Sequence, residues 1–230
     1  MSDMLSSSLF FGVAISLVAY WIGLLLKKRL HSPLFNPLLI AVVFVIIVLL
    51  ISGVEYEGYN VGGKYLTYFL TPSTVCLAIP LYQQLDMLKK NWKAVLFGIA
   101  SGVAASLGSI FLLATAFGLT HEQYVTLLPK SVTTAIAVGI TDTLGGISVI
   151  TSATVIITGI FGNMVAESVL KLAKIDEPIA KGLACGTSAH AIGTAKAMEM
   201  GELEGAMSSL SIAVAGMMTA VIASLFASLY

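Results

Sequence analysis

Long uncharged apolar runs recur along this chain and limit what it can fold into. A helix needs about 20 apolar residues to cross the hydrocarbon layer of a membrane. Segments of about this length lie near 8–26, 33–53, 65–84, 94–118, 146–170 and 205–229. Only 10% of the residues are charged, whereas soluble domains carry about 25%. We therefore predict an all-α integral membrane protein, with one polytopic membrane domain over residues 1–230 and about six full transmembrane helices.

Two polar stretches of helix-like length, 126–143 and 181–200, interrupt this apolar pattern. Their candidate site residues are Lys130, Ser131, Thr133, Thr134, Thr187, Ser188, His190 and Thr194. Neither stretch is apolar enough to face lipid, and non-helical backbone at membrane depth must be buried in protein or line a cavity. We interpret both as broken or re-entrant helical elements, which build substrate sites near the midplane of secondary transporters.

Clusters of basic residues, which favour the cytoplasm, indicate how these elements enter the membrane. The clusters are Lys27, Lys28 and Arg29; Lys89, Lys90 and Lys93; and Lys171, Lys174 and Lys181. If 126–143 crossed completely, the third cluster would lie on the outer side. An element that enters and leaves on one side keeps every cluster cytoplasmic, and 181–200 would then be a second such element. The alternative is eight complete spans, two of them polar.

Short patterns along the chain raise the possibility of an internal repeat. The windows 72–80, 129–137 and 185–193 align hydroxyl, alanine and isoleucine positions. Internal repeats are typical of transporters, so 126–143 and 181–200 could form an inverted pair; windows of small residues also match by chance. Gly98 and Gly102 form a small-residue pattern that marks close helix packing, either within the chain or between two copies in a homodimer.

The polar residues allow a functional and a structural interpretation. On a continuous helix Thr187, His190 and Thr194 share one face, which suits a small polar anion. Lys130 follows Pro129 at an expected helix start, where free N–H groups and a positive dipole attract a carboxylate. The alternatives are hydrogen bonds between helices for the hydroxyls, a packed histidine, and a lysine that reaches the membrane interface.

Other classes of function find no support in the sequence. Nucleic-acid binding requires a basic face, whereas the net charge is zero. No nucleophile–base arrangement, metal-ligand spacing or phosphate loop is present, and Cys76 and Cys185 lie in apolar surroundings. We therefore predict no enzyme activity, no catalytic residues, no metal and no cofactor.

Several motifs resemble the LrgB/CidB family, and they cover most of the chain from about 33 to 220. They are NPLL (36–39), AIPLYQQ (78–84), LPKSVTTAIA (128–137), GGIS (145–148), KGLACGTSAHAIGTA (181–195) and EGAMSSL (204–210). Members are labelled antiholin-like, or as controlling murein-hydrolase export and autolysis. Others are implicated in transport of pyruvate, glycolate or glycerate. The resemblance implies a multi-pass protein of the bacterial plasma membrane, with a small LrgA/CidA-type membrane protein as partner.

Two functions follow from these observations. The polar elements favour a transporter of small monocarboxylates with a midplane site that binds its substrate through the eight candidate residues. The alternative is a holin-like or antiholin-like membrane protein without a defined substrate. Besides the carboxylate and the lipid bilayer, the expected partners are a second copy of the chain, the LrgA/CidA-type protein, or both.

Overall fold

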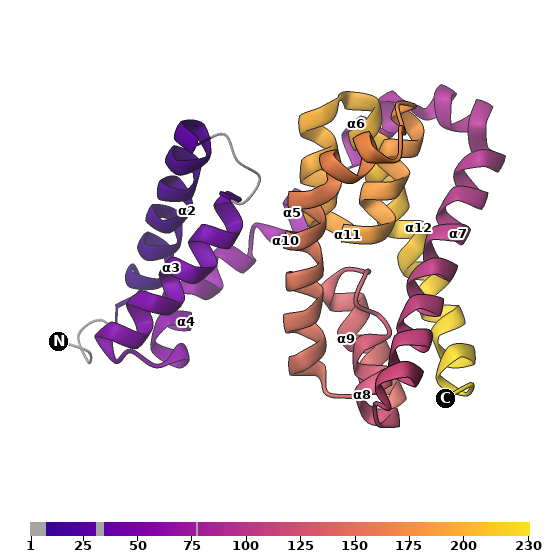
Figure 1. Cartoon of the computed structure of the whole chain (residues 1–230). Helices are drawn as coiled ribbons and strands as arrows, with labels where there is room; N and C mark the ends of the chain where they lie inside the picture. Colours follow the sequence, from indigo (N-terminus) through magenta and orange to yellow (C-terminus); the bar gives the residue numbers. More distant parts are fainter. Residues whose placement is uncertain (1–7, 31–34, 77) are drawn as a thin grey trace. The chain divides into compact units, whose positions relative to one another are not determined.

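The computed structural model describes residues 8–30, 35–76 and 78–230 (Figure 1). None of the described residues forms a strand, and their helices are α2 (Phe11–Leu30), α3 (Pro37–Ser52), α4 (Tyr56–Thr67), α5 (Leu70–Cys76), α6 (Ala78–Gln83), α7 (Leu85–Phe117), α8 (His121–Leu127), α9 (Thr134–Leu144), α10 (Ser148–Leu172), α11 (Pro178–Met200) and α12 (Glu202–Ala227). The chain divides into two compact units, unit 1 (Met1–Cys76) and unit 2 (Leu77–Tyr230).

Four helices are long and apolar enough to cross a membrane: α2, α7, α10 and α12. The helices α3 and α9 are apolar but shorter. This all-helical structure agrees with the predicted class of membrane protein. The helix α7 begins at Leu85, earlier than the predicted span at 94–118, because the helix continues through the basic segment that precedes its apolar part.

Unit 1 is built on α2, which packs against both α3 and α4. The sequence sets the ends of α3 locally. The Asn36 side chain accepts hydrogen bonds from the backbone N–H groups of Leu38 and Leu39, and Pro37 occupies the first turn. Gly53 ends the helix in the left-handed conformation, with φ 66°, which glycine adopts at little cost.

The segment 65–84, predicted as one span with a bend, is divided among the end of α4, α5 and α6. Pro72 lies in the first turn of α5 and Pro80 in the first turn of α6. Proline has no backbone N–H and disrupts the interior of a helix, but the first turn does not use that N–H. Each proline therefore lies at the start of a new short helix rather than inside one long helix.

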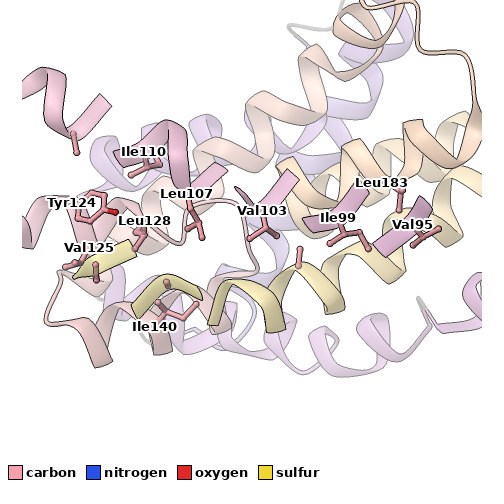
Figure 2. Close-up of a cluster of buried hydrophobic side chains, with 14 of the residues drawn as sticks. Val95, Ile99, Val103, Leu107, Ile110, Tyr124, Val125, Leu128, Ile140 and Leu183 are labelled. Carbon is pink, nitrogen blue, oxygen red and sulfur yellow. The ribbon is translucent and has the colours of Figure 1, made fainter. Parts of the chain in front are cut away.

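The core of unit 2 follows one face of α7 (Figure 2). Val95, Ile99, Val103 and Leu107 recur every four residues and are nearly inaccessible to solvent, as expected for a helix with one buried stripe. Tyr124 and Leu128 of the next segment, Leu183 of α11 and Met207 of α12 belong to the same cluster. Because this stripe holds α7 in place, its neighbouring face of small residues can border open space.

Candidate functional site

The first polar stretch is divided between two helices. Its first helix, α8, ends at Leu127 and α9 begins at Thr134, so 128–133 is not helical. Pro129 explains the break, since helices usually end at or before the residue that precedes a proline. The hydroxyl of Thr126 accepts from the backbone N–H of Ile147 at 2.9 Å, and the Thr151 hydroxyl donates to the Thr126 carbonyl at 2.8 Å. The chain therefore leaves this element beside the point where it entered.

The second polar stretch folds back on itself within α11. Ala189 and His190 have non-helical dihedral angles, and His190 has φ 42° and ψ −135°, close to the first central position of a type II′ turn, which favours glycine. Eight residues of straight helix would span about 12 Å, yet a Cβ on Gly193 would overlap the carbonyl oxygen of Cys185. We call residues 191–200 the returning half of α11.

Three contacts show which way the returning half runs. His190 Nε2 donates to the Val155 carbonyl at 3.0 Å, and Asn163 Nδ2 donates to the Ile192 carbonyl at 2.8 Å. Lys196 Nζ lies 2.6 Å from Glu167 Oε1. These partners advance along both segments in the same direction, so the returning half runs toward the end of α10 that precedes α11. In Figure 1, α8 and α9 lie toward the other end of α10.

Glycines on α10 make room for this fold. A Cβ on Gly159 would lie 2.7 Å from His190 Cε1, and a Cβ on Gly162 would lie 2.5 Å from the Ala189 Cβ. The turn of α11 therefore packs directly on the backbone of α10. The fold also removes the continuous helical face predicted for Thr187, His190 and Thr194: the chain reverses between the first and the last of them.

A groove of about 990 Å³ runs between α7, the first half of α11 and the non-helical segment 128–133. Of the predicted site residues, Lys130, Ser131, Thr187 and Ser188 line it. Thr133, Thr134, His190 and Thr194 are not among the described residues that line it. His190 has the Val155 carbonyl as its partner, and the Thr194 hydroxyl bonds to the Ser208 hydroxyl of α12 at 2.7 Å. A substrate role for these four residues stays a prediction.

The groove is also lined by α7 residues that were not predicted as site residues: Asn91, Ser101, Ser106 and Ser109. The available signal was a face of α7, beside the buried stripe, whose groove-lining residues from Ala94 to Ser109 are all small or carry a hydroxyl. We interpreted part of this face as a packing surface, and that is also correct: Gly98 faces Leu183 and Gly102 faces Thr187 of α11. The small-residue pattern is therefore used inside unit 2.

Lys130 lies near the end of this groove that Ser106 and Ser109 line. Its Nζ donates to Ser131 Oγ at 2.9 Å, and Ser106 Oγ donates to the same Ser131 oxygen at 3.0 Å. A lysine ammonium has three N–H donors, and this bond uses one. Among the described residues, no acidic side chain forms an ion pair with Lys130. The site thus offers a cation with unused donors to a ligand in the groove.

The contact with Ser106 also indicates the depth of Lys130. Ser106 lies 11 residues before Phe117, at the end of α7, which is about 16 Å along the helix. The apolar part of α7, 94–117, is about 35 Å long by the same rise. Through Ser131, Lys130 therefore lies beside the middle of the apolar part of α7, whereas a lysine that reaches the membrane interface lies near the end of such a part.

The other groove hydroxyls donate to their own helices. Ser101 bonds to the Gly98 carbonyl, Ser109 to the Ser106 carbonyl and Ser188 to the Ala184 carbonyl, at 2.6 to 2.8 Å. Their protons are therefore occupied, and only their oxygen lone pairs remain for a ligand. Donors that suit an anion are concentrated at Lys130 and Ser131.

The sequence profile of the LrgB-like family matches residues 16–229. The chain belongs to the LrgB-like family. The antiholin-like protein LrgB of Bacillus cereus (strain B4264) is 43% identical over 220 residues, which cover 94% of this chain and 95% of the relative. The protein of the same name from Bacillus anthracis (strain A0248) has the same identity and coverage. No solved structure matches this LrgB-like protein.

Proposed function

We propose two functions for this protein, and they rest on different observations. The groove in unit 2 supports transport of a small monocarboxylate, and this is the function that the geometry favours. The relatives are named antiholin-like, which supports an antiholin-like role. The comparisons favour this second function over transport. Both functions place the protein in the plasma membrane of a bacterium.

The transport proposal is carried by Lys130, a cation near mid-depth whose free N–H groups face the groove. Two broken elements meet close to it. Val132 and Ala137 of the first pack against the Val155 side chain, and His190 of the second bonds to the Val155 carbonyl. Broken helices bring helix N-termini, with their positive dipole ends, to anionic substrates near the midplane of transporters. In this groove the cation of Lys130 would attract the carboxylate, since Thr133 and Thr134 at the N-terminus of α9 are not among the described residues that line it.

The groove also suggests how a substrate reaches Lys130. Along α7 it extends from Asn91 to Ser109, about 27 Å by helix rise. The end of the groove at Asn91 is near the basic residues at the start of α7, which we assign to the cytoplasm. Beyond Ser109, rings of Phe111, Tyr124 and Tyr230 pack together, and the last two have centroids 4.6 Å apart. We infer that the described conformation is open to the cytoplasmic side.

Cysteine labelling tests this orientation in a variant that lacks Cys76 and Cys185. Ser101→Cys places a thiol in the groove, and Phe97→Cys places one on an exposed face of α7 outside the groove. We expect a membrane-impermeant maleimide to label Ser101→Cys from the cytoplasmic side only. Phe97→Cys should stay unlabelled, because lipid excludes the reagent. Labelling of Ser101→Cys from the outer side alone would contradict the orientation.

Transport itself is tested by counterflow. Liposomes with the purified protein are loaded with unlabelled pyruvate, and entry of radiolabelled pyruvate is followed, with and without a small LrgA/CidA-type partner. We expect faster entry than in protein-free liposomes. Counterflow equal to that of empty liposomes under both conditions would refute the proposal.

The mass of the purified protein in detergent tests the homodimer, which stays a prediction.

The antiholin-like proposal rests on the names of the relatives and concerns autolysis. In a bacterium that lacks its own LrgB-like gene, expression of this protein should slow detergent-induced autolysis. An unchanged rate at equal membrane expression would count against it. A Lys130→Gln variant separates the two functions, since it should lose transport. If it still slows autolysis, control of autolysis does not depend on carboxylate transport.

A further inference from the structure

We propose that Ser106 of α7 is a positioning residue that makes Ser131 a hydrogen-bond donor to the anion at Lys130. This inference rests on the proposed carboxylate site, and it assigns a role to a residue that the sequence motifs do not include. It starts from the two hydrogen bonds that end on one atom, Ser131 Oγ.

A serine hydroxyl has one proton to donate and two lone pairs that accept. Ser106 Oγ donates to Ser131 Oγ at 3.0 Å, and Lys130 Nζ donates to it at 2.9 Å. Both lone pairs of Ser131 are therefore occupied. Its proton is the only group left, and no hydrogen bond within the described residues uses it.

The surroundings of Ser131 make this free proton significant. The residue is 6% exposed and lines the groove. A buried polar group without a partner costs about 1–3 kcal/mol, so a ligand that accepts this proton gains by that satisfaction. Together with the remaining N–H groups of Lys130, the proton forms a site that contains donors only. A carboxylate has lone pairs for all of them, whereas an ammonium ligand has none.

Ser106 maintains this arrangement. Without its hydroxyl, one lone pair of Ser131 is free, and the Ser131 hydroxyl can rotate and donate elsewhere. The loss of one neutral hydrogen bond in such a site corresponds to about a 3- to 10-fold weaker affinity. The structure offers a matched control, because Ser109 lines the same groove on the same helix but donates to the Ser106 carbonyl.

The test measures equilibrium binding of radiolabelled pyruvate to the purified full-length protein, alongside counterflow. Ser106→Ala should raise the dissociation constant about 3- to 10-fold, and Ser109→Ala should change it less than about 2-fold. In a Ser131→Ala background, Ser106→Ala should have no further effect, since contacting residues that act as a unit are not additive. Thermal stability in detergent, compared across all variants, identifies any variant that fails to fold.

Each outcome decides one question. Equal effects of Ser106→Ala and Ser109→Ala, or effects of Ser106→Ala and Ser131→Ala that multiply, would overturn the role of Ser106. If Ser106→Ala does not fold, Ser106→Cys takes its place, because the thiol is similar in size to the hydroxyl but is a weaker donor. Ser106→Cys should then raise the dissociation constant, and an unchanged dissociation constant would overturn the role of Ser106. Wild-type protein that binds pyruvate without counterflow overturns transport alone. Wild-type protein that does not bind pyruvate overturns both pyruvate transport and the role of Ser106.

Discussion

Replacing Lys130 with glutamine will reduce carboxylate transport about 10- to 150-fold at sub-saturating substrate, because a charge-assisted hydrogen bond contributes about 1.5–3 kcal/mol. Glutamine keeps N–H donors of similar reach and removes the charge. The Lys130 ammonium bonds only to Ser131 among the described groups and lines the groove. Its charge is therefore available to the ligand rather than to a carboxylate of the protein.

The matched control for this prediction is Lys93→Gln. Lys93 lies on α7, is exposed and does not line the groove, so its loss should leave transport unchanged. Lys130→Arg keeps the charge and should retain more transport than Lys130→Gln. Initial rates of counterflow measure all three variants, with thermal stability as the check on folding. Normal transport by Lys130→Gln would remove Lys130 from the site.

The second large effect concerns folding. Gly186→Ala should lower the free energy of unfolding by about 3 kcal/mol, the upper part of the range for overpacked cores. A Cβ at Gly186 would overlap the Ser208 carbonyl oxygen of α12 and lie 2.7 Å from the Ser211 Cβ. Backbone atoms cannot move aside as a side chain does, so α11 and α12 must separate. Because Ser208 also bonds to Thr194, the returning half of α11 should shift as well.

Gly108→Ala provides the comparison within the same protein. Gly108 lies inside α7, and nothing comes within 4 Å of a Cβ built there. Alanine has a higher helix propensity than glycine by about 1 kcal/mol, so this variant should be as stable as the wild type or slightly more stable. Thermal unfolding in detergent, monitored as the loss of the monodisperse fraction, measures the stability of both variants. Equal stability of Gly186→Ala and Gly108→Ala would contradict the close contact of α11 with α12.

Local signals in the sequence determined much of this fold. Uncharged apolar runs predicted α2, α7, α10 and α12, because a helix in lipid must satisfy its backbone internally and cover it with apolar side chains. The helix start expected at Pro129 and Lys130 is wrong: 128–133 is not helical, the Lys130 N–H bonds to the Leu127 carbonyl, and α9 begins only at Thr134. Proline restricts the residue before it and ended α8 here instead of starting the next helix. The distribution of charge predicted elements that enter and leave the membrane on one side, and this stays a prediction. In the structure the returning half of α11 runs back along α10.

Tertiary packing decided the composition of the candidate site. Sequence periodicity indicates which residues share a face of one helix. The prediction of a common face for Thr187, His190 and Thr194 therefore required a straight helix. The reversal at His190 depends on α10, where Gly159 and Gly162 leave space for it. In the same way, Ser106 and Ser131 lie 25 positions apart, and only the packing of α7 on the segment after α8 joins them. A hydroxyl in a membrane protein can bond to its own helix or to a neighbour, and the choice depends on atoms that are distant in sequence.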